Sequence, residues 1–462
     1  MNTISTVVDT AFPLLHPRPA QGWLNDPNGI CFRDGRWHVF FQHNPESARH
    51  SSIAWGHISS GDLLHWNEEP VALRPQPGGP DAFGCWTGVM ADDDGVPTAV
   101  YSGVKDSSGS SRVTLARGSS DLSKWRQDGE TAAGMPDDPL VTAVRDPFLF
   151  TYKGRRFAIQ GAGLADGRGA LLLYNAADLA HWEYLGIWLT TADPVAAEFA
   201  SSNIWECPQI VEVDGRWLVI VSLWQLRDQH HHLSGVGHLI GSMHDDGGLP
   251  VFVPEAGGRT DEGPDFYAPQ LVALEDRAVL WGWSWESRSE EAADAAGWAG
   301  LLTFPRELSI SNDCLVVAPA RELVGYRRRP LEARPSDEGA FPGDRPSDEG
   351  ARGDQVINLP SPAEAVVSPL GDRPSRGDRP SDEGARGDQV TVALKLVSPS
   401  SSRVVYSSTG SAGVQVFVDA SIVEVYREGT TAVTLRAYPE ADEKWVLEVT
   451  GDASVDAWEL GL

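Results

Sequence analysis

Residues 22–41 read GWLNDPNGICFRDGRWHVFF, and this stretch carries the pattern that decides the fold. Asp34-Gly35 is a strong two-residue hairpin signal, and the apolar run at 37–41 that follows it predicts a β-strand. Upstream, Asp-Pro and Asn-Gly dipeptides mark a tight turn that holds Asp26 beside Trp23. The stretch therefore predicts a carboxylate on a rigid turn that leads into a hairpin.

The hairpin signal recurs about every 60 residues along the first two thirds of the chain. It is found at Asp34-Gly35, Asp94-Gly95, Lys153-Gly154, Asp214-Gly215 and, in a weaker form, Asp276-Arg277. A second repeat, D-L-x-x-W, has the same period and occupies residues 62–66, 121–125 and 178–182. Helical periodicity is scarce, so these repeats predict an all-β fold with a five-bladed β-propeller over residues 12–308. A parallel β-helix is the structural alternative, but its repeats are much shorter.

The pattern changes in residues 309–462, for which we predict a C-terminal β-sandwich domain. Apolar and polar residues alternate in five short segments, at 390–397, 414–418, 422–426, 433–438 and 445–449. Residues 333–390 are of low complexity: GDRPSDEGARGDQV occurs at 343–356 and again at 377–390. Because this composition buries little apolar surface, we predict a disordered insertion at 333–390.

Composition limits the partners. The net charge of −28 and the pI near 4.7 argue against nucleic acid and anionic membrane surfaces. Four widely spaced cysteines form no C-x-x-C pair, which predicts neither a disulfide framework nor a zinc site. No secretory signal and no apolar run long enough for a transmembrane helix is apparent, so we expect a cytoplasmic protein. We also expect that it needs no metal and no cofactor.

Three carboxylates hold matching places in the repeats. Asp26, Asp146 and Glu206 each come just before an inferred strand, while Trp86 and Tyr267 take the matching places in the second and fifth repeats. Equivalent positions of successive blades lie at one radius and height, so these side chains are expected to converge at one mouth of the propeller. Without the repeat, three separate turn-capping acids would be the simpler interpretation.

Converged carboxylates suit glycoside hydrolysis, which uses one carboxyl group as acid and base and another as nucleophile or as base toward water. Crowding raises the pKa of a carboxyl group, and a cation such as Arg145 is expected to keep its neighbour Asp146 charged. Metal binding is the competing use of clustered acids, but no ligand-rich loop accompanies them. A metal site at His230-His231-His232 with His238 is a weaker hypothesis, and Cys207 is interpreted as a packing residue beside Glu206.

The residues around the carboxylates resemble the signature motifs of glycoside hydrolase family 32, the invertase and fructanase family. The similar stretches are residues 23–29 (WLNDPNG), 145–147 (RDP), 206–208 (ECP), 41–45 (FQHNP), 55–57 (WGH), 265–270 (DFYAPQ), 304–308 (FPREL) and 416–426 (VFVDASIVEVY). The similarity covers most of the chain except 333–390.

The resemblance implies a five-bladed propeller with a β-sandwich and retaining hydrolysis of β-fructofuranosides. It implies that Asp26 is the nucleophile, Glu206 the general acid/base, and Asp146 the residue that holds two fructose hydroxyls and stabilises the transition state. It also implies a set of substrate-binding residues: Asn25, Gln42, Trp86 and Arg145 in the fructose pocket, and Thr87, Tyr101 and Trp283 at its edge. This chain departs from the family at two rim places, with His50 where an aromatic residue is common and Trp86-Thr87-Gly88 where Phe-Ser-Gly is common.

Three hypotheses follow: a β-fructofuranosidase acting on sucrose or short fructosides, a fructosyltransferase in which a sugar hydroxyl replaces water, and a non-catalytic carbohydrate-binding propeller. The partner expected in each case is a small or oligomeric fructoside. Sucrose, sucrose 6-phosphate, inulin and levan stay open as substrates, and so does the oligomeric state.

Overall fold

A computed structural model describes residues 9–228, 230–336, 353–370 and 389–462. The chain divides into two compact units, one of residues 16–322 and the other of the described residues up to Leu15 and from Leu323 on. The boundary differs from the expected 308/309, because Leu308 lies within a hairpin, residues 306–319, that completes a sheet of the first unit. The short segment before His16 belongs to the second unit, where Leu14 and Leu15 donate main-chain hydrogen bonds to Asp419 at 2.8 Å.

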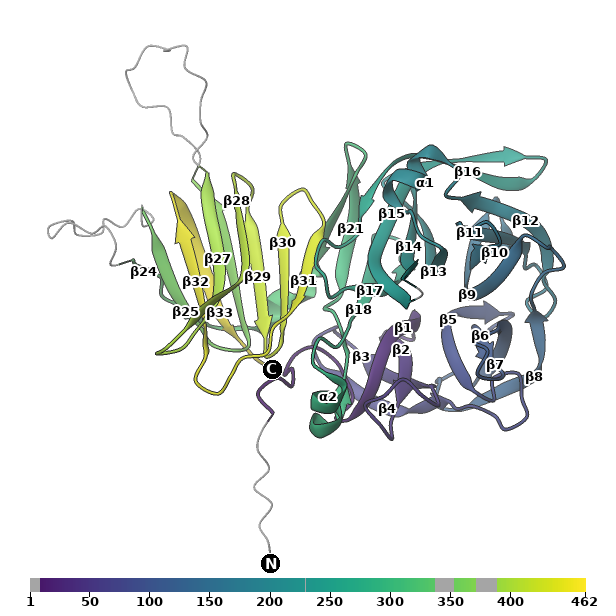
Figure 1. The fold of residues 1–462 in the computed structure, drawn as a ribbon, viewed down its shortest axis with the longest axis horizontal. Coiled ribbons are helices and arrows are strands. Elements are labelled where there is room, and N and C mark those ends of the chain that lie inside the picture. The colour runs from purple at the N-terminus through teal and green to yellow at the C-terminus, as the bar shows by residue number, and fades with distance from the viewer. Residues whose placement is uncertain (1–8, 229, 337–352, 371–388) are drawn as a thin grey trace, which may run out of the picture. The chain divides into compact units, whose positions relative to one another are not determined.

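Antiparallel four-stranded groups, each in chain order, build the first unit (Figure 1). The first sheet contains β1 (Gly22–Arg33), β2 (Arg36–Asn44), β3 (Ala54–Ser60) and β4 (Trp66–Leu73), with β19 (Trp298–Ala299) parallel to β1. The second contains β5 (Gly84–Asp93), β6 (Val96–Val104), β7 (Ser111–Gly118) and β8 (Trp125–Ala133).

Two further groups join into one eight-stranded sheet through a contact between β10 and β13. Its strands are β9 (Val141–Tyr152), β10 (Arg155–Leu164), β11 (Gly169–Asn175), β12 (Glu183–Thr190), β13 (Ile204–Val213), β14 (Arg216–Arg227), β15 (His230–Asp246) and β16 (Leu249–Arg259). The last sheet of the unit contains β17 (Tyr267–Ala273), β18 (Ala278–Ser284), β20 (Leu301–Leu302), β21 (Arg306–Ser311) and β22 (Cys314–Pro319). The helical segments are α1 (Pro194–Phe199), α2 (Glu290–Ala296) and the 3₁₀ segment η1 (Arg321–Tyr326).

The predicted hairpin turns are confirmed. Asp34 and Gly35 have φ of 50° and 75°, and the turns at residues 94–95, 153–154 and 214–215 have the same pair of positive φ angles. Positive φ at both central residues defines the type I′ turn, whose twist matches that of the strands it joins. The weaker fifth signal also lies in a turn, where Leu274 donates its main-chain N–H to Arg277 O at 2.8 Å.

The D-L-x-x-W repeats have a structural role. The indole N–H groups of Trp66, Trp125 and Trp182 donate to the carbonyl oxygen of the leucine three residues earlier, at 3.2, 3.0 and 2.9 Å. Each of these leucines is buried, so the repeat anchors the turn that leads into the outer strand of its group.

The first strand of each group faces the centre of the unit. These strands contact one another in a closed ring, in the order β1, β5, β9, β13, β17 and back to β1. Each carries a shift in its pairing register near its start, which is the mark of a β-bulge. The bulges lie at matching places, namely between Leu24 and Pro27, Cys85 and Gly88, Arg145 and Pro147, Glu206 and Gln209, and Tyr267 and Gln270. The ring therefore brings matching bulges, and the side chains on them, toward a common centre.

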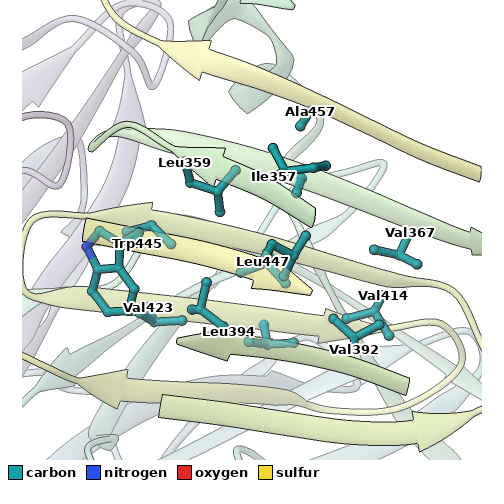
Figure 2. Packing of buried hydrophobic residues seen from close by; sticks show 14 of the residues in the cluster. Ile357, Leu359, Val367, Val392, Leu394, Val414, Val423, Trp445, Leu447 and Ala457 are labelled. Atoms are coloured by element: carbon teal, nitrogen blue, oxygen red, sulfur yellow. The ribbon is translucent and has the colours of Figure 1, made fainter. Parts of the chain in front are cut away.

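The second unit consists of two antiparallel sheets that share one apolar core (Figure 2). One sheet contains β23 (Arg327–Leu331), β33 (Ala453–Leu460), β26 (Ala363–Pro369), β29 (Val414–Asp419), β30 (Ile422–Arg427) and β31 (Ala432–Arg436). The other contains β24 (Arg334–Pro335), β25 (Gln355–Leu359), β32 (Lys444–Thr450), β27 (Val390–Val397) and β28 (Ser402–Gly410). Alternate residues of β27 are buried, so the predicted period of two and the sandwich are confirmed here.

The predicted insertion at 333–390 is wrong for its middle part. β25 and β26 lie inside that range and each pairs with strands of a sandwich sheet. The core contains the buried side chains of Ile357, Leu359 and Val367. Polar repeats flank this short apolar segment on both sides, which is why the sequence predicts it as part of the insertion. The predicted disorder of 337–352 and 371–388 falls outside the described residues.

Candidate active site

Three of the inner strands position the predicted carboxylates. Asp26 lies on β1, Asp146 on β9 and Glu206 on β13, each at the bulge of its strand. Asp146 has a φ of 55°, which β-bulges permit and a regular strand does not. Its main-chain N–H donates to Ser102 Oγ on β6 at 2.8 Å, which fixes the bulge against the preceding group.

Asp26 is 8% exposed and accepts hydrogen bonds from three neutral side chains. Asn25 Nδ2 donates to its Oδ1 at 2.9 Å, while Gln42 Nε2 and Thr87 Oγ1 donate to its Oδ2 at 2.9 and 2.5 Å. Burial raises the pKa of Asp26, and the Glu206 charge adds to this; the hydrogen bonds from Thr87 and Asn25 oppose it. Oδ1 accepts from Asn25 alone, whereas Oδ2 accepts from both Gln42 and Thr87.

Asp146 is buried and sits between like charges. Burial, and next the negative charge of Glu206, raise its pKa to about 7, while Arg145 acts in the opposite direction. The pKa values of Asp146 and Asp26 are thus both raised, mainly by burial and further by the negative charge of Glu206. The effect of Arg145 on the pKa of Asp146 has the expected direction, and its Nη1 also donates to Glu206 Oε1 at 2.8 Å.

Glu206 has two strong donors. Besides Arg145, the Tyr267 hydroxyl donates to Glu206 Oε2 at 2.9 Å. Burial, and the charge of Glu206, hold the pKa of Tyr267 well above its usual value, so this phenol keeps its proton. Arg145 in turn lies over the Trp224 ring, 5.4 Å from its centroid. Tyr267 occupies the register position of Glu206 on the neighbouring inner strand; the repeat places it there, but nothing in the sequence showed that its hydroxyl would reach Glu206.

Cys207 connects two of the carboxylates. Its Sγ lies 3.6 Å from Asp26 Oδ2 and 3.5 Å from Asp146 Oδ2, and its main-chain N–H donates to Asp146 Oδ2 at 2.9 Å. Burial, and then the nearby carboxylates, raise the pKa of the thiol far above its usual value, so the sulfur is a neutral weak donor here.

Most of the other predicted substrate-binding residues gather around Asp26. Asn25, Gln42 and Thr87 contact it directly, as described above. Trp86 is half-buried and meets the His50 ring edge-on, with centroids 5.7 Å apart. Trp283 is buried and packs on Trp23 at 5.9 Å.

Tyr101 does not lie at the edge of this site, contrary to expectation. It is fully buried, and its hydroxyl donates to Asp81 Oδ2 at 2.6 Å. Tyr101 pairs with Gly88, beyond the bulge of β5, so its ring packs into the core against Trp55, with centroids 5.7 Å apart.

The histidine run at 230–232 extends from the start of β15. His231 stacks on Trp224 with centroids 3.6 Å apart, and His238 is buried farther along the strand. Within the described residues, His, Cys, Asp and Glu form no group of three or more that is arranged to hold a metal ion. Nor does the described part of the chain contain a helix long and apolar enough to cross a membrane.

The propeller-like ring of inner strands and the carboxyl groups that it carries define a class of protein. Asp26 is held by neutral donors only, whereas Glu206 is held by a guanidinium and a phenol, so two neighbouring carboxyl groups stand in different environments. Paired carboxyl groups with distinct surroundings are the apparatus of a glycoside hydrolase.

Comparison with known proteins gives the family. The sequence profile described as glycosyl hydrolases family 32 N-terminal domain matches residues 16–319, and that described as glycosyl hydrolases family 32 C terminal matches residues 372–459. The chain belongs to glycoside hydrolase family 32.

Two relatives and two solved structures illustrate the similarity. A raffinose invertase of Escherichia coli is 33% identical over 335 residues, covering 70% of this chain and 67% of its own. A sucrose-6-phosphate hydrolase of Klebsiella pneumoniae is 32% identical over 331 residues, covering 70% and 69%. A family 32 β-fructofuranosidase of Bombyx mori superposes with a TM-score of 0.75 at 22% identity, covering 98% of this chain and 94% of its own. A sucrose-6-phosphate hydrolase of Lactobacillus gasseri superposes with a TM-score of 0.76 at 19% identity, with the same coverage.

Proposed function

We propose that this glycosidase hydrolyses terminal β-D-fructofuranosides, such as sucrose or sucrose 6-phosphate, with retention of configuration, in a site at the mouth of a five-bladed propeller. The observation that carries the proposal is the contrast between Asp26 and Glu206. Asp26 keeps an oxygen with one hydrogen bond, from Asn25, while both oxygens of Glu206 are held by donors on β9 and β17. The relatives named as invertase and sucrose-6-phosphate hydrolase support the substrate class.

In the first step, Asp26 Oδ1 attacks the anomeric carbon of the fructosyl unit. The bond from that carbon to the glycosidic oxygen breaks, and Glu206 gives its proton to the departing oxygen. Asn25, Gln42 and Thr87 orient the Asp26 carboxylate for the attack. The product of this step is a fructosyl ester of Asp26 and a free leaving group.

In the second step, Glu206 is a carboxylate and takes a proton from water, whose oxygen attacks the same carbon. The ester bond breaks and returns the electron pair to Asp26, so two inversions give net retention. Asp146 binds fructose hydroxyls, and the Cys207 N–H holds its Oδ2 in place for this role. When a sugar hydroxyl replaces water, the same step gives fructosyl transfer.

The predicted cytoplasmic location is part of this proposal, since all four cysteines are free thiols. The five-blade assignment rests on the five inner strands of the ring, each of which begins a four-stranded group.

The test is release of fructose from sucrose, sucrose 6-phosphate, inulin and levan by the wild type and by the isosteric variants Asp26→Asn and Glu206→Gln. We expect turnover of at least one substrate by the wild type and a loss of at least about a thousandfold in each variant. Equal rates in all three proteins would overturn the assignment and leave the carbohydrate-binding alternative. Analysis of products at high sucrose separates hydrolysis from transfer.

A further inference from the structure

Two side-chain amides flank Asp26 and present their NH₂ ends to it. Asn25 Nδ2 donates to one carboxylate oxygen and Gln42 Nε2 to the other, both at 2.9 Å. An amide has a donor end and an acceptor end of nearly the same shape. A half-turn of either amide would bring its oxygen against the carboxylate and replace an attraction by a repulsion. Donors at the oxygen ends of the two amides would therefore reinforce the donating orientation.

A ring nitrogen faces the oxygen end of each amide. Trp23 Nε1 donates to Asn25 Oδ1 at 2.6 Å. His50 Nε2 lies 3.4 Å from Gln42 Oε1, and Gln42 is 3% exposed, so this buried oxygen depends on a protein donor. The Trp23 and His50 rings meet edge-on, with centroids 5.8 Å apart, so the two ring donors pack against each other beside Asp26.

The two ring donors differ in kind. An indole N–H is always a donor, whereas a neutral imidazole donates from Nε2 only in the tautomer that carries its hydrogen there. Burial lowers the pKa of His50, which favours the neutral ring. A phenylalanine at this position would fill similar space against Trp23 and Trp86 but would leave Gln42 Oε1 without a donor.

We propose that His50 and Trp23 are positioning residues that lock the Gln42 and Asn25 amides so that both donate to Asp26, with His50 in the Nε2–H tautomer. The proposal rests on the proposed function in one respect, the role of Asp26 as nucleophile. It assigns His50 a specific hydrogen-bonding task at a position where the family commonly has an aromatic ring.

The kinetic test compares His50→Phe, which keeps a ring and removes the donor, with His50→Gln, whose amide N–H can reach the place of Nε2. We expect kcat to fall about five- to tenfold in His50→Phe and to recover at least half of the loss in His50→Gln, since one hydrogen bond is at stake. Trp23→Phe is expected to show a similar loss. His181→Phe, the same change at an exposed ring that contacts Asp178, is the matched control and should keep the wild-type rate.

Wild-type kcat in His50→Phe, or an equal loss in His50→Phe and His50→Gln, would overturn the proposal while the fructosidase assignment stands.

A second test needs no turnover. Long-range ¹H–¹⁵N correlation spectra of protein labelled at histidine show which ring nitrogen carries the hydrogen, and the signal missing from His50→Phe identifies His50. We expect the Nε2–H tautomer at neutral pH. The Nδ1–H tautomer would overturn the proposal even in a protein inactive on every fructoside, so the two failures are distinguishable.

Discussion

The main-chain N–H of Cys207 donates to Asp146 Oδ2 at 2.9 Å, and this bond joins residues 61 positions apart on neighbouring inner strands. Cys207 has a φ of 46° and Asp146 a φ of 55°, so both ends of the bond lie on bulges with left-handed backbone. The bulge on β13 thus turns an N–H away from its own four-stranded group and toward the Asp146 carboxylate of β9. Backbone geometry, and not side-chain type alone, determines where Asp146 is held.

The Asp146 carboxyl group is expected to reduce stability as the pH rises. Its pKa is about 7 in the folded protein, above the ordinary 3.8, so between these values the folded chain binds more protons than the unfolded chain. Below about pH 4 the protonated Asp146 makes its full contribution to the free energy of unfolding. This contribution is lost as the pH rises to about 7. Asp146→Asn removes this titration, and asparagine tolerates the positive φ at this position.

We expect Asp146→Asn to be inactive yet more stable than the wild type at pH 8, by at most about 4 kcal/mol, and no more stable at pH 4. Urea unfolding at both pH values measures the difference. A variant that is less stable than the wild type at pH 8 would contradict the raised pKa of Asp146.

Tyr267→Phe tests the second donor to Glu206. The substitution removes one hydroxyl and leaves Arg145 as the donor to the other oxygen of Glu206. Because a buried oxygen left without its donor costs about 1–3 kcal/mol, kcat/KM should fall about 5- to 100-fold on whichever fructoside the wild type prefers. Tyr184→Phe on the outer strand β12 removes a comparable hydroxyl, which donates to Asp138, and should leave the rate unchanged. Equal rates in Tyr267→Phe and the wild type would show that Arg145 alone positions Glu206.

The repeats in the sequence predict the ring of inner strands and its three carboxylates because hairpin turns and blade period are local patterns. The direction of a side chain at a bulge depends on how two strands pair, which is not a local pattern. Tyr101 comes one residue before Ser102, whose Oγ accepts from the Asp146 main chain, and the pairing of β5 with β6 directs the Tyr101 ring into the core. Tyr267 reaches Glu206 for the converse reason, since its matching register puts the hydroxyl across the ring.

Gly161 on β10 allows the inner strand β13 to approach closely. It pairs with Arg145, and a Cβ built on it would lie 2.2 Å from Trp205 O and 3.3 Å from Glu206 Cα. These contacts are to backbone, so Gly161→Ala must displace β13 at Glu206. We expect a loss of activity of at least about tenfold with the chain still folded, because a displacement of about 1 Å is costly in catalysis.

Gly129→Ala is the matched control, since a Cβ at Gly129 meets nothing within 4 Å. Fructose release and circular dichroism together separate a displaced acid from an unfolded protein. Full activity in Gly161→Ala would mean that β13 yields without moving Glu206.

The middle of the low-complexity region is expected to carry part of the sandwich's stability. Ile357 on β25 is 1% exposed and packs with Leu394 and Leu447 in the apolar core (Figure 2), while its neighbour Asn358 points to solvent. Truncation of a buried isoleucine leaves a cavity, so Ile357→Ala should destabilise the sandwich by about 2–5 kcal/mol. Asn358→Ala, one residue away on the same strand, should change stability by no more than about 0.5 kcal/mol. Urea unfolding followed by far-ultraviolet circular dichroism measures both, and equal stabilities would mean that β25 does not contribute to the core.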